Sequence, residues 1–384
     1  MLQSRMPTCL WAHSDPANGR SIRGHQIVEM GLVKLYRVTG KQAYLDLARF
    51  MLDSRGGGST YNQADVPVVA QTRAEGHAVR ATYMYSGMAN VAAMTGDKPY
   101  VHALDRIWEN VVNKRLYVTG GIGALGQGEA FGADYELPNM SAYNETCAAV
   151  GNVFWNQRMF LLHGDAKYID VLERTLYNGL ISGVSLDGKT YFYPNPLASN
   201  GQHQRSPWFG VACCPGNITR FMPSLPGYVY AEQDGTLFNL FMSNTADIVL
   251  RNGRKLKVTQ QTGYPWSGDV KISIDPEQAG VFAVRVRIPG WARNEAVSGD
   301  LYGFVDGGNA PVKLQVNGAE EPVHLENGIC HREPRMAQGR HDQPHLADAG
   351  PADSGELQGQ CGRGPRRSVA QFLCPTAWFA ADSL

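Results

Sequence analysis

The chain has 384 residues, 43% of them hydrophobic and 18% charged, which is enough for two domains and a large buried core. Its 35 Lys and Arg residues balance 35 Asp and Glu residues, so no surplus of charge points to nucleic acid, an anionic membrane or a charged partner. The sequence has no transmembrane run, no apolar segment of a secretory signal in its first residues and no regular disulfide framework among its 7 cysteines, so we expect a cytoplasmic protein with reduced thiols.

From about residue 21 to 230 the apolar residues recur with the period of an α-helix. One turn pattern occurs three times, at residues 37–44, 94–100 and 162–168. In each copy an apolar helix stops at a glycine, which can adopt the left-handed conformation of a helix C-cap, and an aromatic residue opens the next helix. Helical hairpins that repeat in this way predict an α-solenoid or a closed α/α toroid.

From about residue 235 to 328 the period changes to two. Segments 237–242, 246–250, 255–259 and 283–289 alternate apolar and polar residues between turns rich in Gly, Asn and Asp, which predicts β-strands. The sequence therefore predicts a mainly α protein with an all-β second domain: a partial (α/α)6 toroid over residues 1–232, followed by a β-sandwich over residues 233–328.

Neither period continues in residues 329–384, which are rich in Gly, Arg, Pro, Gln and His. One interpretation is a disordered tail. We favour a reading-frame change, because Met336-Ala337 must be encoded ATG-GCN and a shift of one base gives a Trp codon. Continued in that frame, residues 338–342 permit Trp-Arg-Lys-Gly-Asp-Thr, a plausible strand and turn. We assign no function to Cys330, Cys361 or Cys374, and resequencing the gene across the junction would test the hypothesis.

Two motifs of the helical region carry soft or anionic side chains: Asn144-Glu145-Thr146-Cys147 and Cys213-Cys214-Pro215-Gly216-Asn217. Thiolates suit zinc, and a carboxylate can complete a tetrahedral set of ligands. Glu145 and Cys147 can converge if they lie at a helix start with Asn144 as N-cap, where the helix also lowers a thiol pKa. We expect the Cys213-Cys214 pair in a loop. Spacing alone leaves two alternatives open, a metal site or two buried structural thiols with an oxidisable vicinal pair.

These motifs resemble those of glycoside hydrolase family 127, the β-L-arabinofuranosidase family, formerly a domain of unknown function. The resemblance covers residues 10–328. It is most specific at residues 144–152 and 213–217 and at two glycine-rich segments before them, 120–124 and 128–132.

The resemblance implies a retaining hydrolase with an unusual nucleophile. Most retaining glycosidases use two carboxylates, whereas in this family a cysteine thiolate held on zinc attacks the sugar. Carried over by motif, Cys213 is the nucleophile, and Glu129 is the acid/base. Glu145, Cys147 and Cys214 complete the zinc shell around Cys213. Taken alone, Glu129 reads as a solvated loop carboxylate, and only the glycines around it and the family match favour the catalytic role.

Three further residues are expected to contact the sugar. His25 and His77 each lie at a predicted helix start, and helix starts around a toroid line its mouth. A lone histidine is more often a structural residue, but the family resemblance makes His77 a substrate ligand and His25 a weaker candidate. Tyr193 likewise matches a family position that contacts the sugar, and its ring and hydroxyl suit furanose recognition.

Members of the family are longer and have about twelve toroid helices, so we expect this chain to be truncated before residue 10. Three alternatives to the hydrolase stay open: an inactive fragment, a non-catalytic module stabilised by zinc, and another toroidal enzyme such as an uronyl hydrolase or sugar epimerase. The last would have no use for Cys213-Cys214. We expect a small-molecule or oligosaccharide substrate and no nucleic-acid or membrane partner, and we consider a homodimer.

Overall fold

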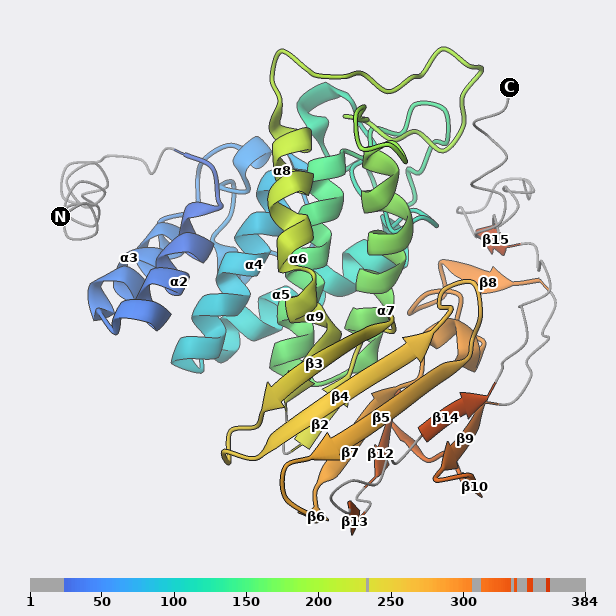
Figure 1. Cartoon of the computed structure of the whole chain (residues 1–384). Helices are drawn as coiled ribbons and strands as arrows, with labels where there is room; N and C mark the ends of the chain where they lie inside the picture. Colours follow the sequence, from blue (N-terminus) through green and yellow to red (C-terminus); the bar gives the residue numbers. More distant parts are fainter. Residues whose placement is uncertain are drawn as a thin grey trace. The chain divides into compact units, whose positions relative to one another are not determined.

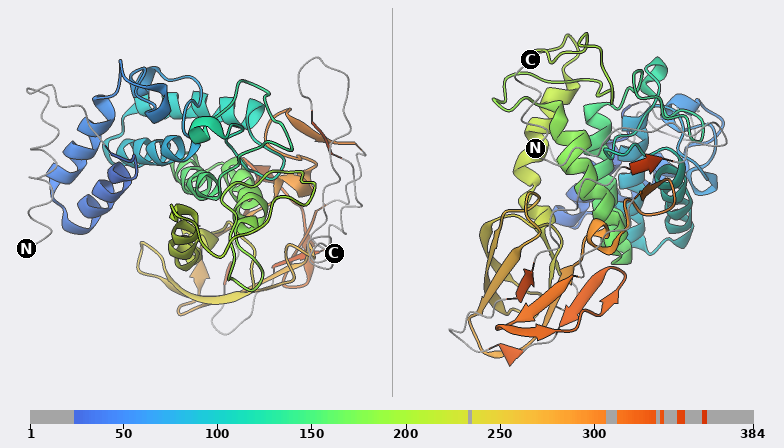
Figure 2. Two further views of the ribbon diagram at one scale, coloured as in Figure 1. Left: turned by 90° about the horizontal axis from the view of Figure 1, so that it is seen from above. Right: turned by 90° about the vertical axis from the view of Figure 1, so that its right-hand side faces the viewer.

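The structure is a computed structural model that describes residues 24–232, 235–305, 312–332, 335–336, 344–347 and 357–359. They form two compact units (Figures 1 and 2). The first comprises residues 24–163 and 171–221, and the second comprises residues 164–170 and the described residues from 222 onward. Over the described ranges, no helix is both long and apolar enough to cross a lipid bilayer.

The first unit is helical. Its helices are α2 (Val28–Thr39), α3 (Gln42–Asp53), α4 (Ala78–Thr95), α5 (Lys98–Lys114), α6 (Thr146–His163), the part of α7 (Ala166–Arg174) from Val171 onward, and α8 (Cys213–Phe221). Short helical turns connect them: η2 (Thr60–Asn62), η3 (Val68–Ala70), η4 (Gln127–Glu129), η5 (Thr175–Leu180) and η6 (Ile181–Gly183).

The three repeated turns lie where the helices were predicted to end. Gly40, Gly96 and Gly164 follow α2, α4 and α6 with φ values of 69°, 72° and 69°. In this region of φ glycine has no steric penalty, so each residue ends its helix and lets the chain reverse. The aromatic residues that come next in the repeats are all buried: Tyr44, Tyr100 and Tyr168.

Alternate helices pack into one inner layer, in the order α2, α4, α6 and α8. Helices α4 and α6 are buried on almost every side, whereas α5 buries a single face and lies outside. The contact between α4 and α6 depends on Gly151, where an added Cβ would lie 2.1 Å from Oγ1 of Thr82. Because each inner helix is followed by a reversal, the inner helices start at the same end of the unit.

The second unit is rich in β-strands. These are β1 (Tyr230–Glu232), β2 (Gly235–Phe238), β3 (Asn244–Val249), β4 (Lys255–Thr262), β5 (Val270–Pro276), β6 (Gly280–Val281), β7 (Ala283–Arg287), β8 (Tyr302–Phe304), β9 (Lys313–Val316), β10 (Ala319–Glu321), β11 (Leu325–Glu326), β12 (Ile329–Arg332), β13 (Arg335–Met336), β14 (Pro344–Ala347) and β15 (Leu357–Gly359). Short helical segments η7 (Met222–Ser224), α9 (Pro226–Val229) and η8 (Gly290–Arg293) complete it.

Most of these strands form two sheets, ordered β1-β2-β7-β12-β11 and β10-β9-β14-β5-β4-β3. One hydrophobic core takes side chains from both sheets, including Val284 and Val286 of β7 and Val258 and Ile272 of β4 and β5. Two sheets that share a core are a β-sandwich, as the alternating pattern predicted.

The sheet extends past the boundary that the sequence suggested at residue 328. Strand β12 pairs with β7 over residues 329–332, and Cys330 is buried in the core of the sandwich. Three later strands are also described, whereas residues 337–343, the subject of the reading-frame hypothesis, lie outside the described residues, as do Cys361 and Cys374.

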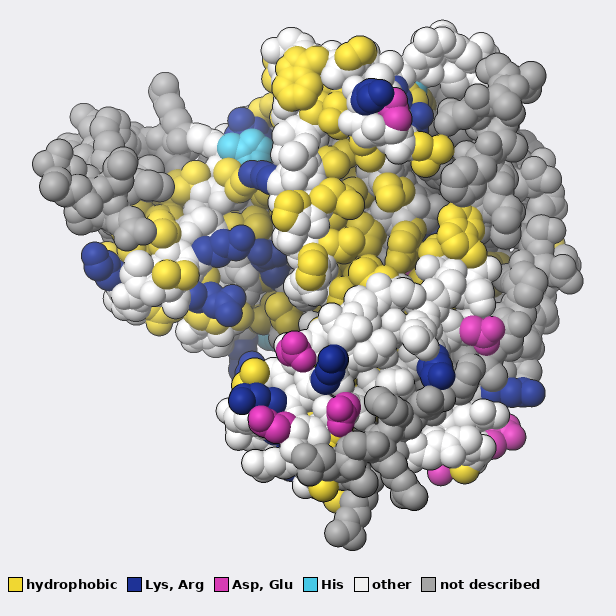
Figure 3. All heavy atoms as spheres, viewed as in Figure 1, with side chains coloured by type: hydrophobic (Ala, Val, Ile, Leu, Met, Phe, Trp, Pro, Cys, Tyr) yellow, Lys and Arg dark blue, Asp and Glu magenta, His cyan; other side chains and the backbone are white. Residues whose placement is uncertain are grey.

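Hydrophobic side chains gather on one face of the helical unit, in the view of Figure 3, over the position of α6, α7 and α8 in Figure 1. Large apolar side chains that are exposed in this unit include Val38 on α2 (85% exposed) and Leu161 on α6 (63% exposed).

Candidate active site

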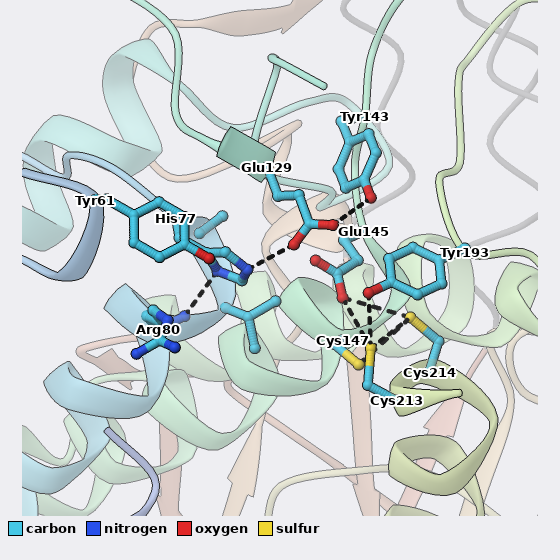
Figure 4. Close-up of polar contacts among 12 residues, drawn as sticks. Tyr61, His77, Arg80, Glu129, Tyr143, Glu145, Cys147, Tyr193, Cys213 and Cys214 are labelled. Atoms are coloured by element: carbon cyan, nitrogen blue, oxygen red, sulfur yellow. Dashed lines mark hydrogen bonds and ion pairs between the residues drawn. The ribbon is translucent and has the colours of Figure 1, made fainter. Parts of the chain in front are cut away.

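The starts of three inner helices bring the predicted site residues together (Figure 4). His77 is the N-cap of α4, Glu145 directly precedes α6, and Cys213 is the first residue of α8. A helix N-terminus carries a partial positive charge that favours anionic groups such as carboxylates and thiolates. The parallel inner helices therefore place acidic side chains where the backbone stabilises them.

Glu145, Cys147, Cys213 and Cys214 form a tight cluster in which four ligand atoms lie within 4.8 Å of one another. The Sγ atom of Cys214 is 3.4 Å from Sγ of Cys147 and 3.7 Å from Sγ of Cys213. Oε1 of Glu145 is 3.5 Å from the sulfur atoms of both Cys213 and Cys214. Such a group of thiols and a carboxylate could hold a metal ion.

The members of this cluster differ from one another in burial and in pKa. Cys147, Cys214 and Glu145 are buried, whereas Cys213 is exposed. Hydrogen bonds from the thiols of Cys147 and Cys214 lower the pKa of Cys213 below its ordinary value, which favours the thiolate form of its sulfur. Burial, with the negative charge of Cys213 beside it, raises the pKa of Glu145 to about 9. The one exposed sulfur of the cluster is therefore also its most acidic.

Two local predictions about these motifs are wrong. Helix α6 begins at Thr146, so Glu145 rather than Asn144 takes the position before the helix, and both amide atoms of Asn144 are buried without a hydrogen-bond partner among the described residues. Cys213 and Cys214 are not in a loop but open α8. Proline is well tolerated in the first turn of a helix, so Pro215 does not exclude this start.

Glu129 lies on the loop between α5 and α6, in the turn η4. Its φ of 51° is in the left-handed region, which is uncommon for a residue with a side chain. Backbone hydrogen bonds hold the loop in place: Leu125 and Ala130 exchange two, and Phe131 donates one to the carbonyl of Gly76. The loop that carries Glu129 is thus tied to the segment that carries His77.

His77 contacts Glu129 directly. Nδ1 of His77 accepts the backbone N–H of Arg80, so Nε2 carries the proton and donates to Oε2 of Glu129 at 2.7 Å. Burial lowers the pKa of His77, in agreement with a neutral ring. The residue before it must be glycine, because the φ of Gly76 is 66° and a Cβ there would lie 2.0 Å from the carbonyl oxygen of Thr60.

Tyr193 and His25 occupy different places relative to the cluster. The hydroxyl group of Tyr193 lies 3.0 Å from Sγ of Cys213 and can donate to the thiolate. The ring of His25 instead packs edge-on against Tyr83, with centroids 5.5 Å apart, and its Nδ1 is buried without a hydrogen-bond partner in the described part of the chain. Burial, with Arg80 nearby, lowers the pKa of His25 to about 4.

Sequence reasoning missed Tyr143 and Tyr61. The hydroxyl group of Tyr143 donates to Oε1 of Glu129 at 2.7 Å. Tyr61 packs edge-on against His77, with ring centroids 5.3 Å apart, and the guanidinium group of Arg80 lies 5.3 Å from its ring centroid. No local pattern marks either tyrosine, because both reach the site through tertiary contacts.

The site therefore has two chemically different sides. On one side is the exposed sulfur of Cys213, backed by two buried thiols and the carboxyl group of Glu145, and on the other is Glu129 with hydrogen-bond donors on both oxygens. Glu145 lies between them, since it belongs both to the group with Cys213 and to a second group with His77 and Glu129, and within each group the ligand atoms lie within 4.8 Å of one another. A thiol and a carboxyl group on two sides of one site could act as a nucleophile and as an acid or base.

Comparison with known proteins points to the same chemistry. Residues 11–227 match the model of the β-L-arabinofuranosidase GH127 catalytic domain, and residues 235–331 match that of the GH127 middle domain. A non-reducing end β-L-arabinofuranosidase from Bifidobacterium longum subsp. longum is 38% identical over 370 residues, in an alignment that covers 85% of this chain. This chain spans about half (53%) of the length of that relative.

Two solved structures are also similar. A GH127 β-arabinofuranosidase is 52% identical with a TM-score of 0.83, over 88% of this chain and 53% of that one. Ara127N-Se, a GH127 β-L-arabinofuranosidase from Geobacillus stearothermophilus T6, is 36% identical with a TM-score of 0.77, over 88% of this chain and 58% of that one. These likenesses confirm the predicted fold, a helical toroidal region followed by a β-domain.

Proposed function

The chain belongs to the GH127 family of β-L-arabinofuranosidases, and we propose that it acts as a retaining glycoside hydrolase that releases L-arabinofuranose from β-L-arabinofuranosides. The observation that carries the proposal is that Cys213 is the one exposed member of the Cys/Glu cluster, with two further thiols and the carboxyl group of Glu145 beside its sulfur. A purely structural thiol would be buried, as Cys147 and Cys214 are. The family also leaves the uronyl hydrolase and epimerase alternatives without support.

The donor set fits a zinc ion. In a tetrahedral site with Zn–S bonds of about 2.3 Å and a Zn–O bond of about 2.0 Å, neighbouring sulfurs lie about 3.8 Å apart and sulfur and oxygen about 3.5 Å apart. The separations of 3.4 and 3.7 Å between sulfurs and of 3.5 Å from Glu145 are close to these. Oε1 of Glu145, at 3.5 Å from the sulfurs of both Cys213 and Cys214, is the oxygen that such an ion would use.

Zinc would be held by Glu145, Cys147, Cys213 and Cys214, and it would keep the thiols deprotonated at neutral pH. Cys213 supplies the nucleophile of the first step. Its sulfur attacks the anomeric carbon, a C–S bond forms as the glycosidic C–O bond breaks, and Glu129 gives its proton to the departing oxygen. The hydroxyl group of Tyr193 at 3.0 Å steadies the sulfur before the attack.

In the second step Glu129 acts as a base. It takes a proton from water, the water oxygen attacks the anomeric carbon, and the C–S bond breaks to free Cys213. Two inversions at one carbon retain its configuration. His77 and Tyr193 flank the path between the thiolate and Glu129, which supports their assignment to sugar binding, whereas His25 lies farther back against Tyr83.

The test is hydrolysis of p-nitrophenyl β-L-arabinofuranoside by the zinc-loaded chain and by Cys213→Ala and Glu129→Gln variants. We expect both substitutions to abolish turnover, or nearly so, while Cys330→Ala, which changes a buried cysteine of the β-sandwich, keeps it. Mass spectrometry of Glu129→Gln after incubation with substrate should find a pentosyl group on the peptide that contains Cys213. A folded, zinc-loaded chain that hydrolyses no arabinofuranoside would contradict the proposal.

Two further properties belong to the same proposal. The thiols of Cys147, Cys213 and Cys214 must stay reduced to bind zinc, which supports a reducing compartment such as the cytoplasm. The homodimer considered from the sequence stays a prediction, to be checked by light scattering.

A further inference from the structure

Both oxygens of Glu129 accept a hydrogen bond, each from a different element. Nε2 of His77, at the start of α4, donates to Oε2 at 2.7 Å, and the hydroxyl group of Tyr143, two residues before Glu145, donates to Oε1 at 2.7 Å (Figure 4). One such contact would leave the carboxylate free to turn about that bond. Two contacts on different oxygens fix its plane.

Glu129 needs this support because the hydrogen bonds of its loop hold its backbone but not its side chain. It ends a three-residue turn on a connecting loop, with φ in the left-handed region, and its side chain is 30% exposed. Side chains of this kind have few packing neighbours that select one rotamer. Its orientation therefore depends on hydrogen bonds from groups that are better held.

Tyr143 is such a group. Its backbone N–H donates to the carbonyl of Ala124, and its carbonyl accepts from Asn195. Ala124 is followed by Leu125, whose backbone exchanges two hydrogen bonds with Ala130, the residue after Glu129. The segment Ala124-Leu125 therefore holds the backbone of Tyr143 at a fixed distance from that of Glu129. The ring of Tyr143 also packs against the ring of Tyr193, with centroids 6.2 Å apart, so the hydroxyl group has a defined position.

We propose that Tyr143 is a positioning residue for the acid/base of this site and acts through Glu129. This inference rests on the proposed function. Its hydroxyl group holds Oε1, and together with His77 it aims the carboxyl group at the oxygen of the leaving group. A general acid contributes about 10²- to 10⁴-fold only if it lies in hydrogen-bond reach of the oxygen that it protonates.

The proposal predicts an effect that depends on the leaving group. p-Nitrophenolate departs without protonation, whereas an alkoxide does not. The variant Tyr143→Phe keeps the ring and removes only the hydroxyl group. We expect it to lower kcat/KM for an alkyl β-L-arabinofuranoside by about 10- to 100-fold, the effect of one hydrogen bond to a charged group, and for the p-nitrophenyl substrate by less than about threefold.

The matched control is Tyr117→Phe. Tyr117 is buried, whereas Tyr143 is half-buried, and the hydroxyl group of Tyr117 donates to the carbonyl of Pro138 at 3.2 Å, outside the site. We expect this variant to leave kcat/KM unchanged for both substrates. If Tyr143→Phe lowers kcat/KM equally for both substrates and also lowers zinc content or melting temperature, Tyr143 has a structural role and the proposal is wrong.

Crystal structures of the parent and of Tyr143→Phe give a readout that does not need turnover. We expect the carboxylate of Glu129 to be ordered in the parent and to rotate or split into two orientations in the variant. An unchanged carboxylate would overturn the inference. If the parent hydrolyses neither substrate, the proposed function fails, and the two crystal structures still decide whether Tyr143 positions Glu129.

Discussion

The packing of α4 against α6 can be tested with one methyl group, in the variant Gly151→Ala. The added Cβ would lie 2.1 Å from Oγ1 and 3.0 Å from Cβ of Thr82, which is fully buried. Thr82 cannot turn away freely, because Oγ1 donates to carbonyl groups of Ala78 and Val79. Overpacking of this kind costs about 1–3 kcal/mol, against a gain of about 0.5–1 kcal/mol in helix propensity.

We therefore expect a net loss of up to about 2.5 kcal/mol, or up to about 10 °C in Tm for a unit of this size. The assay is thermal unfolding followed by circular dichroism at a helical wavelength. Gly31→Ala is the matched control, since Gly31 is in α2 with nothing within 4 Å of an added Cβ, and it should gain stability. Thr82→Ala should restore part of the loss in the double variant. Equal melting temperatures for Gly151→Ala and Gly31→Ala would refute the reasoning.

Three other predictions concern the site and its supports. Cys214→Ala should remove the stoichiometric zinc that we expect in the parent and lower Tm, and a chelator should lower the Tm of the parent but not of the variant; elemental analysis and calorimetry check both. The pKa of His25 is lowered to about 4, so the folded state disfavours the charged ring: its contribution to stability is present above about pH 6.5 and is lost as the pH falls towards 4. Unfolding at pH 7 and pH 5 should therefore differ less in His25→Gln than in the parent. The side-chain amide of Gln63, itself buried, reaches the carbonyl groups of Tyr61, Glu75 and His77; Gln63→Ala should cost about 1–3 kcal/mol and Gln63→Glu, which sets a carboxylate against three carbonyls, more, as measured by urea unfolding.

Much of the fold could be predicted because short stretches of sequence determine where its helices end and where its strands lie. A glycine that ends a helix, such as Gly40 or Gly96, acts through its own φ angle, and a strand such as β4 alternates within its own eight residues. The change of period near residue 235 likewise separates helical from β-rich sequence without any knowledge of contacts.

The site was predictable only in part. Spacing pointed to Glu145, Cys147 and the Cys213-Cys214 pair, but Pro215 and Gly216 were read as a loop where they continue the first turn of a helix. The hydrogen bond between Tyr143 and Glu129 could not be predicted, because it depends on backbone hydrogen bonds that join Ala124 to Tyr143 and Leu125 to Ala130. Such pairings depend on which segments meet in the folded chain, not on any period.

The segment between η6 and α8 leads into Cys213 and contributes no ligand to the cysteine cluster. Residues 184–212 run from a strand-like bridge at Val184 and Tyr191 to Cys213 and carry exposed side chains such as Trp208. Since doubling a loop's length costs only about 0.6 kcal/mol, insertions here are cheap. The length and surface of this segment away from Tyr193 can therefore change while Cys213 keeps its place at the start of α8.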